Sequence, residues 1–168
     1  MEYARRFDQL DRTSVAVPVA ELAAAEKALA PSFRAAVRAA SRNIRAFAKL
    51  QLPRPFTKVV APGLKLGQIV RPLDAIGAYI PAGRYPLPST LMMTVIPAQV
   101  AGVPNVMVAS PRAVNEVFGT ASLLGVSRVF QMGGAQAIAA FAYGTRTVPK
   151  ADRIVGPGNI YVAAAKKL

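Results

Sequence analysis

The second part of the sequence alternates short apolar runs with longer segments that carry helical periodicity. The runs, each of four or five residues, are IGAYI, NVMVA, RVFQM and RIVG. Apolar runs of this length, bounded by turn residues, are typical of buried strands. Helical segments follow them: one with Ser89 as its N-cap, one from about Arg112 to Leu124, then AQAIAAFAYG, and last NIYVAAAKKL with Asn159 as its N-cap. The alternation predicts an α/β fold with a parallel sheet and helices on both faces.

The first part of the sequence predicts helices. VAVPVAELAAAEKALA has a proline and a carboxylate near its start, as a helix entry should, and a second helix is expected from Pro31 to about Gln51. Three prolines and a glycine then interrupt the chain between Leu52 and Gly63. We therefore expect a helical segment over residues 1–63, part of a first domain, and an α/β region over residues 64–168. LKLGQIVRPL, which opens the second region, alternates like a half-buried strand.

The predicted helix after Pro31 is amphipathic and carries the one ordered basic stripe of the chain. Its apolar face holds Phe33, Val37, Ala40, Ile44 and Phe47, and its basic face holds Arg34, Arg38, Arg42, Arg45 and Lys49. The formal net charge of the chain is +13, which raises the question of nucleic-acid binding. A solvated helix face is the simpler interpretation, because no aromatic residue interleaves with the arginines to stack on bases. We expect no nucleic-acid partner, and a non-catalytic basic binding module stays as an alternative.

Three small-residue bends follow predicted strands, where α/β sheets build ligand crevices. In GAYIPAGRYP, Gly77, Pro81 and Gly83 allow a tight reversal beside Tyr79, whose ring is either offered to a ligand or part of a structural loop. In QMGGAQAIAA the paired glycines precede a helix N-terminus, a place that favours phosphate, and Gln136 is the polar residue there. GPGN repeats this arrangement with Asn159.

Groups for acid–base or metal chemistry are scarce. The sequence has no histidine, no cysteine and only eight carboxylates. In the α/β region the candidates are Asp74, Glu116, Asp152 and the lysines. We interpret Glu116, in the middle of a predicted helix, and Asp152, in a connector, as solvated surface residues, and no two carboxylates are spaced as a catalytic pair or a metal site. We therefore predict no catalytic residue and no metal ligand in this chain. No apolar run is long enough for a membrane span, and the charged start MEYARRFDQLDR favours a cytoplasmic location.

The sequence resembles the histidinol dehydrogenase family over essentially its whole length. The resemblance rests on GQIVRPLDAIGAYIPAGRYPLPSTLMMTVIPAQVAGV, on GGAQAIAAFAYGTRTVPKADRIVGPGN and on IYVAAAKK, with YARRFD and RNIRAFAKLQ similar to the leading helices. It implies an incomplete Rossmann-like domain that binds NAD, in a zinc-dependent homodimer that oxidises histidinol twice to histidine. The NAD contacts of the family fall on Tyr79, Gln136 and Asn159.

Two departures from the family pattern qualify this expectation. Ala82 stands where many members have glycine, so an NAD-dependent dehydrogenase of another primary alcohol is an alternative. The family's zinc ligands, its substrate-binding serine and its catalytic Glu-His pair lie C-terminal to the region matched. We accordingly expect a truncated, internal piece of the enzyme from its N-terminal half, which supplies the NAD-binding side and is inactive alone.

Overall fold

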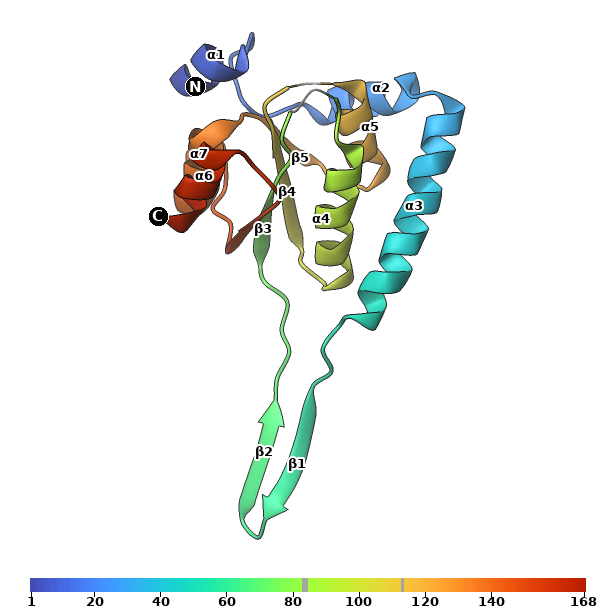
Figure 1. Ribbon diagram of the computed structural model, residues 1–168, viewed down its shortest axis with the longest axis vertical. Helices are drawn as coiled ribbons and strands as arrows, with labels where there is room; N and C mark the ends of the chain where they lie inside the picture. The colour runs from blue at the N-terminus through green and yellow to red at the C-terminus, as the bar shows by residue number, and fades with distance from the viewer. Residues whose placement is uncertain (83–84, 113) are drawn as a thin grey trace.

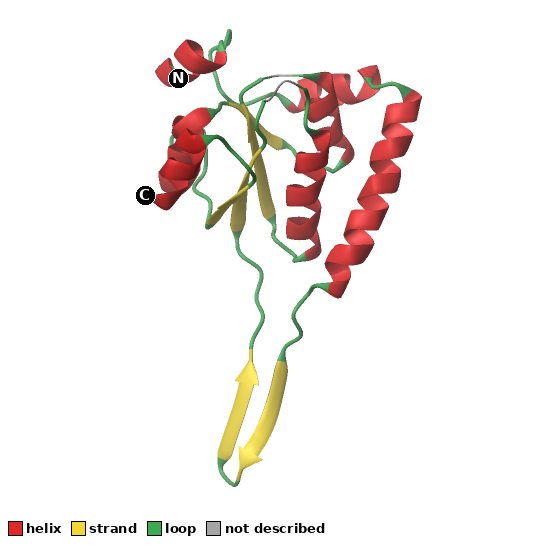
Figure 2. Cartoon of the chain, viewed as in Figure 1, coloured by secondary structure: helices red, strands yellow, loops and turns green. Residues whose placement is uncertain are grey.

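The computed structural model describes residues 1–82, 85–112 and 114–168. The chain has seven helices and six strands in those residues (Figures 1 and 2). In chain order they are α1 (Glu2–Asp8), α2 (Val19–Ala28), α3 (Pro31–Leu50), β1 (Phe56–Ala61), β2 (Leu64–Gln68), β3 (Ala75–Tyr79), α4 (Pro88–Val100), β4 (Asn105–Ser110), α5 (Asn115–Leu123), β5 (Arg128–Gln131), α6 (Gly134–Tyr143), β6 (Arg153–Val155) and α7 (Ile160–Lys167).

Four strands form a parallel sheet in the order β5-β4-β3-β6. Within this sheet β3 comes first along the chain. β4 and β5 are added on one side of it, and the chain then crosses back to place β6 on the other side of β3. Strand order therefore reverses between β3 and β6. In open α/β sheets such a reversal separates the loops at the carboxyl ends of the strands and leaves a crevice for ligands.

Alternate residues of the strands face two separate apolar layers. Ile76, Ala78 and Val108 pack with α2, α4 and α5, while Met107 and Phe130 pack with α6 and α7 on the opposite face. Figure 1 shows these two helical layers on either side of the sheet. The expectation of an α/β fold with a parallel sheet and helices on both faces is confirmed.

The N-terminal helices pack into the same body as the α/β region. Leu22 and Ala25 of α2 belong to the apolar core above the sheet, and α3 packs on α4 through Val37. Ahead of α2, the backbone of Val15 and Val17 pairs with the outer edge of β5, with Gln131 N donating to Val15 O (2.7 Å) and Val17 N donating to Val129 O (2.8 Å). The boundary at residue 63 stays a prediction.

Between α3 and β3 the structure differs from the sequence-based expectation. Phe56–Ala61, expected within a proline-rich break in the helical segment, forms β1, which pairs antiparallel with β2. Every residue of both strands is exposed, so β2 is not half-buried, and the hairpin projects from the body in Figure 1. The alternation in LKLGQIVRPL reports strand geometry correctly, but burial needs a second layer, and the described chain places none against either face.

Smaller differences concern helix ends and one helix face. Helix α4 begins at Pro88 with Leu87 as its N-cap, so Ser89 lies inside the helix because the proline takes the first helical position. Helix α5 begins at Asn115, three residues after the predicted start. Phe47, placed on the apolar face of α3, is 63% exposed, although the neighbouring Ala48 is buried. Gly83, in the first predicted bend, lies outside the described residues.

No helix in the described residues is both long enough and apolar enough to cross a membrane.

Candidate functional site

Where strand order reverses, the loop after β6 comes unusually close to the end of β3. Gly156, directly after β6, has φ +108°, and a Cβ built on it would lie 2.1 Å from the carbonyl oxygen of Tyr79 at the end of β3. A side chain cannot occupy that space, and a φ of this size is rare for residues other than glycine. The ends of β3 and β6, the two strands beside the crevice, therefore approach each other at Gly156, where the geometry requires glycine.

Tyr79 points from the end of β3 into the layer beneath α6. Its side chain is buried, and its hydroxyl oxygen accepts a hydrogen bond from the backbone N–H of Gly134 (3.2 Å) at the start of α6. The ring is therefore part of the core in this structure, and its hydroxyl edge ties β3 to α6. Burial raises the pKa of the Tyr79 hydroxyl above its ordinary value; the hydrogen bond from Gly134 opposes the rise and the charge of Asp8 adds to it.

The start of α6 holds a carboxylate that the sequence did not suggest. Asp8, the last residue of α1, accepts hydrogen bonds from the backbone N–H of Gly133 (2.8 Å) and from Nε2 of Gln136 (3.1 Å). A negative group is stabilised at a helix N-terminus by free N–H groups and the helix dipole. The position at α6 that the paired glycines suggested for a phosphate is thus held by Asp8. Its partners lie more than 120 residues away in sequence, so no local pattern could have identified it.

Asn159 takes the position predicted for it, as the N-cap of α7. Its side-chain oxygen accepts a hydrogen bond from the backbone N–H of Val162 (3.1 Å), and the residue is exposed. Lys166, from the last turn of α7, donates from Nζ to the carbonyl oxygen of Gly156 (2.5 Å), and burial lowers the pKa of its ammonium group. Lys166 is a second residue beside the crevice that sequence reasoning missed.

The three predicted residues therefore lie on one face of the sheet but in two groups. Tyr79 and Gln136 are linked at the start of α6, through Gly134 and its neighbour Gly133. Asn159 is at the start of α7, which packs against α6 through Val162. No hydrogen bond among the described residues joins Asn159 to the other two.

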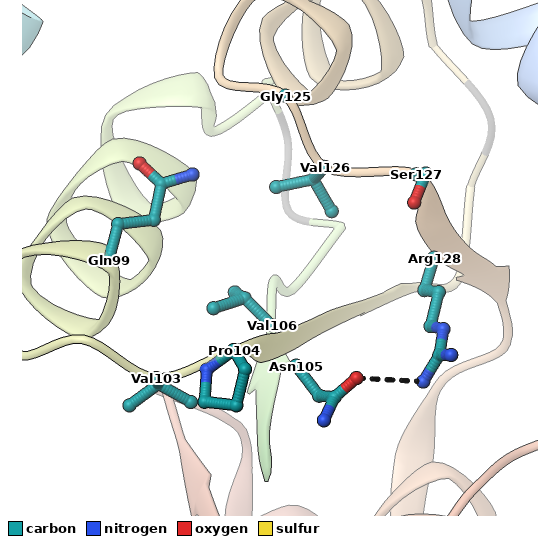
Figure 3. A pocket seen from close by; sticks show the side chains of 9 residues that line it. All are labelled: Gln99, Val103, Pro104, Asn105, Val106, Gly125, Val126, Ser127 and Arg128. Carbon is teal, nitrogen blue, oxygen red and sulfur yellow. Dashed lines mark hydrogen bonds between the residues drawn. The ribbon is translucent and has the colours of Figure 1, made fainter. Parts of the chain in front are cut away.

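A separate cleft of about 250 Å³ lies at the opposite end of the sheet, beside the starts of β4 and β5 (Figure 3). Three of its polar side chains are already paired: Arg128 donates to Oδ1 of Asn105 (3.3 Å), and Gln99 donates to the carbonyl oxygen of Leu124 (2.6 Å). Ligands of open α/β sheets bind at the carboxyl ends of the strands. We therefore interpret this cleft as a packing feature.

Two of the acidic residues considered as catalytic candidates, Asp152 and Glu116, stabilise the ends of a strand and a helix. Oδ2 of Asp152 accepts from the backbone N–H groups of Asp74 (2.9 Å) and Ala75 (2.8 Å), so Asp152 fixes the start of β3 and is more than a solvated residue. Glu116 lies in the first turn of α5, where a carboxylate favours the helix dipole. Within the described ranges no three His, Cys, Asp or Glu residues gather as a possible metal site.

Replacing Tyr79 with phenylalanine tests the hydroxyl link between β3 and α6. We expect a loss of about 1 kcal/mol in the free energy of unfolding at neutral pH, because the Gly134 N–H loses its acceptor. Because burial raises the folded-state pKa of the Tyr79 hydroxyl, the stability of the wild type relative to Tyr79→Phe is constant below the unfolded value of about 10 and falls as the pH rises above it.

The measurement is urea unfolding at several pH values, with tyrosinate absorbance as a second readout. Tyr79 is buried, whereas the other four tyrosines are 58–80% exposed, and burial raises the pKa of the Tyr79 hydroxyl above its ordinary value. The lowered pKa of Lys166 acts with the opposite sign over the same range, but it cancels in the difference between the wild type and Tyr79→Phe. Identical pH profiles for the two proteins would contradict the assignment.

Comparisons with known proteins agree with this architecture along the whole chain. The sequence model of the family described as histidinol dehydrogenase matches residues 1–168. The chain is 47% identical to the histidinol dehydrogenase of Aquifex aeolicus and 45% identical to that of Methanothermobacter thermautotrophicus, covering 100% and 99% of this chain and 40% of each relative. The crystal structure of histidinol dehydrogenase from Elizabethkingia anophelis superposes with a TM-score of 0.93 at 36% identity, over 99% of this chain and 40% of that one.

The chain thus spans about 40% of the length of the relatives it matches. Both the sequence match and the structural match extend over the strand-order reversal, the paired glycines before α6 and the N-cap of α7. The chain belongs to the histidinol dehydrogenase family.

Proposed function

We propose that this chain forms the NAD-binding side of an NAD- and zinc-dependent histidinol dehydrogenase. The reaction is the oxidation of histidinol through an aldehyde to histidine, within histidine biosynthesis, in a cytoplasmic homodimer. The observation that carries the proposal is the placement of Tyr79, Gln136 and Asn159, which lie on one face of the sheet where strand order reverses. Family membership supports the oxidoreductase class.

The residues around the reversal fit a dinucleotide. The glycine at position 156 lets the loop after β6 approach the end of β3, and Asn159 is exposed at the start of α7. Helix N-termini and glycine turns of this kind let ligands approach the backbone closely. Gln136 and Asn159 would hold the cofactor by hydrogen bonds, and Tyr79 would fix the first turn of α6 through the hydrogen bond that its hydroxyl accepts from Gly134. When bound, NAD supplies the acceptor for the hydride removed from the alcohol.

The residues of this chain do not fit the zinc site. Zinc in proteins is bound by His and Cys nitrogen and sulfur, with Asp or Glu oxygen as a further ligand. The sequence contains neither histidine nor cysteine. We derive no zinc-dependent step from this chain, and in the proposal the zinc ligands and the acid–base groups come from other parts of the enzyme.

Replacing Gln136 with alanine tests the proposed cofactor site. The loss of a buried hydrogen-bonding partner costs about 1 to 3 kcal/mol, so we expect NAD binding to weaken by about five- to 150-fold. Ligand-observed NMR titration of the 168-residue chain suits this measurement because it reports weak affinities. Gln51→Ala, at the exposed C-cap of α3, is the matched control and should bind NAD as the wild type does. Equal NAD affinity in Gln136→Ala and the wild type would remove the site assignment.

A further inference from the structure

We infer that Asp8 is a positioning residue that turns the side-chain oxygen of Gln136 toward the ligand, so that the start of α6 recognises a hydrogen-bond donor of a nucleoside and not a phosphate. The inference rests on the proposed function, because it takes Gln136 as a cofactor contact. It adds a residue from α1 to the site and specifies the chemical class of group that the site accepts.

Asp8 fixes which end of the Gln136 amide faces it. An ionised carboxylate has only acceptor sites, whereas a glutamine amide has an oxygen acceptor and a nitrogen donor on opposite sides. The contact between Asp8 Oδ2 and Gln136 Nε2 (3.1 Å) therefore commits the nitrogen to Asp8. The amide oxygen is left on the other side, where it accepts hydrogen bonds and cannot donate them.

The position of the amide oxygen agrees with this orientation. Oε1 of Gln136 lies over Gly134, so close that a Cβ at that glycine would be 2.7 Å from it. Gly134 has φ +59° and presents no side chain, which leaves room for the oxygen to lie across the first turn of α6. Gly134, the second glycine of the pair, thus makes space for the side-chain amide of Gln136, the proposed ligand contact.

The same contacts leave the start of α6 with little capacity for a phosphate. Two of its first N–H groups already have acceptors, Gly133 in Asp8 (2.8 Å) and Gly134 in the Tyr79 hydroxyl (3.2 Å). A phosphate brought to the same place would meet the carboxylate, and like charges at close range repel. A ligand group that approaches Gln136 must therefore donate a hydrogen bond, which ribose hydroxyls, the adenine amino group and the nicotinamide carboxamide can do.

The test is a mutant cycle on the 168-residue chain, with NAD and inorganic pyrophosphate as probes in NMR titrations. Asp8→Ala should weaken NAD by about five- to 50-fold, because the amide is no longer oriented. Asp8→Asn, whose oxygen can still accept from Gln136, should restore affinity to within about threefold of the wild type. The double variant Asp8→Ala with Gln136→Ala should bind NAD no more weakly than Gln136→Ala alone, since Asp8 acts through that residue. Pyrophosphate should bind more tightly to Asp8→Ala than to the wild type.

Asp11→Ala, at an exposed neighbour in the same segment, is the control and should change neither affinity. If Asp8→Ala does not fold, Gln136→Glu places two carboxylates face to face and should weaken NAD, and Asp8→Asn combined with Gln136→Glu should recover part of the loss by reversing donor and acceptor.

The outcomes separate this inference from the proposed function. Additive losses from Asp8→Ala and Gln136→Ala, or unchanged NAD affinity in Asp8→Ala, would overturn the role of Asp8 and leave the cofactor site standing. Absence of NAD binding in the wild type would overturn the proposed function. The side-chain amide NMR signal of Gln136 then decides the orientation without a ligand: it should shift between the wild type and Asp8→Ala, and an unshifted signal would overturn it.

Discussion

Replacing Phe141 with alanine is expected to lower the free energy of unfolding by about 3 to 5 kcal/mol, the range for large aromatic truncations in a core. Phe141 is fully buried on α6, at the centre of the layer between that helix and the sheet. Its ring packs edge to face with Phe130 of β5, at a centroid distance of 6.2 Å and an interplanar angle of 75°. It also lies directly against Gly77 of β3, where a Cβ would be 2.6 Å from the ring.

Urea unfolding followed by circular dichroism measures this change. Tyr143→Ala, two residues along the same helix and 80% exposed, is the matched control and should change the free energy by no more than about 0.5 kcal/mol. A loss below about 1 kcal/mol for Phe141→Ala would mean that the layer collapses around the missing ring. The helix would then hold Gln136 less firmly than the structure indicates.

The α/β alternation was predictable because each strand and each helix is indicated by the residues of its own segment. Apolar runs such as NVMVA and RVFQM are buried on both faces by helices, so they read as continuous strands, and β4 and β5 lie where these runs do. Asn159 was recognisable as an N-cap because the signal is a single side chain beside the helix it begins. Tyr79, Gln136 and Asn159 were located for the same reason, since each lies at the end of a strand or within a few residues after it. Their role as cofactor contacts stays a prediction.

Features that depend on distant segments were not predictable from the sequence. Asp8 is an ordinary carboxylate at the end of a short helix until the fold brings it to the start of α6. Strand β1 was missed because prolines on both sides of it suggested a break, and the exposure of β2 was missed because alternation does not reveal whether a second layer covers a hairpin. An isolated two-stranded hairpin is only marginally stable in water, so its local pattern is weak by nature.

Gly156→Ala is the substitution that most directly tests the geometry of the crevice. We expect it to lower the free energy of unfolding by about 3 to 5 kcal/mol, because the new methyl group adds a backbone collision to the strain of a positive φ. The Cβ would lie 2.1 Å from the Tyr79 carbonyl oxygen. This oxygen belongs to the backbone at the end of β3, and Gly156 directly follows β6, the neighbouring strand, so neither can turn away as a flexible side chain could.

The chain supplies a control that isolates the collision from the strain. Gly125, after α5, also has a positive φ (+73°), but a Cβ there would have no neighbour within 4 Å. Gly125→Ala should therefore cost only the left-handed conformation, about 1 to 2 kcal/mol. The difference between the two variants, measured by urea unfolding, reports the cost of the collision with β3, together with any extra strain of the larger φ at Gly156. If Gly156→Ala cost no more than Gly125→Ala, the two loops would be free to separate, and the crevice at the strand-order reversal would be wider than the structure has it. Because Asn159 lies three residues after Gly156, the same separation would move the N-cap of α7 away from Tyr79 and Gln136, and NAD affinity would then fall together with stability.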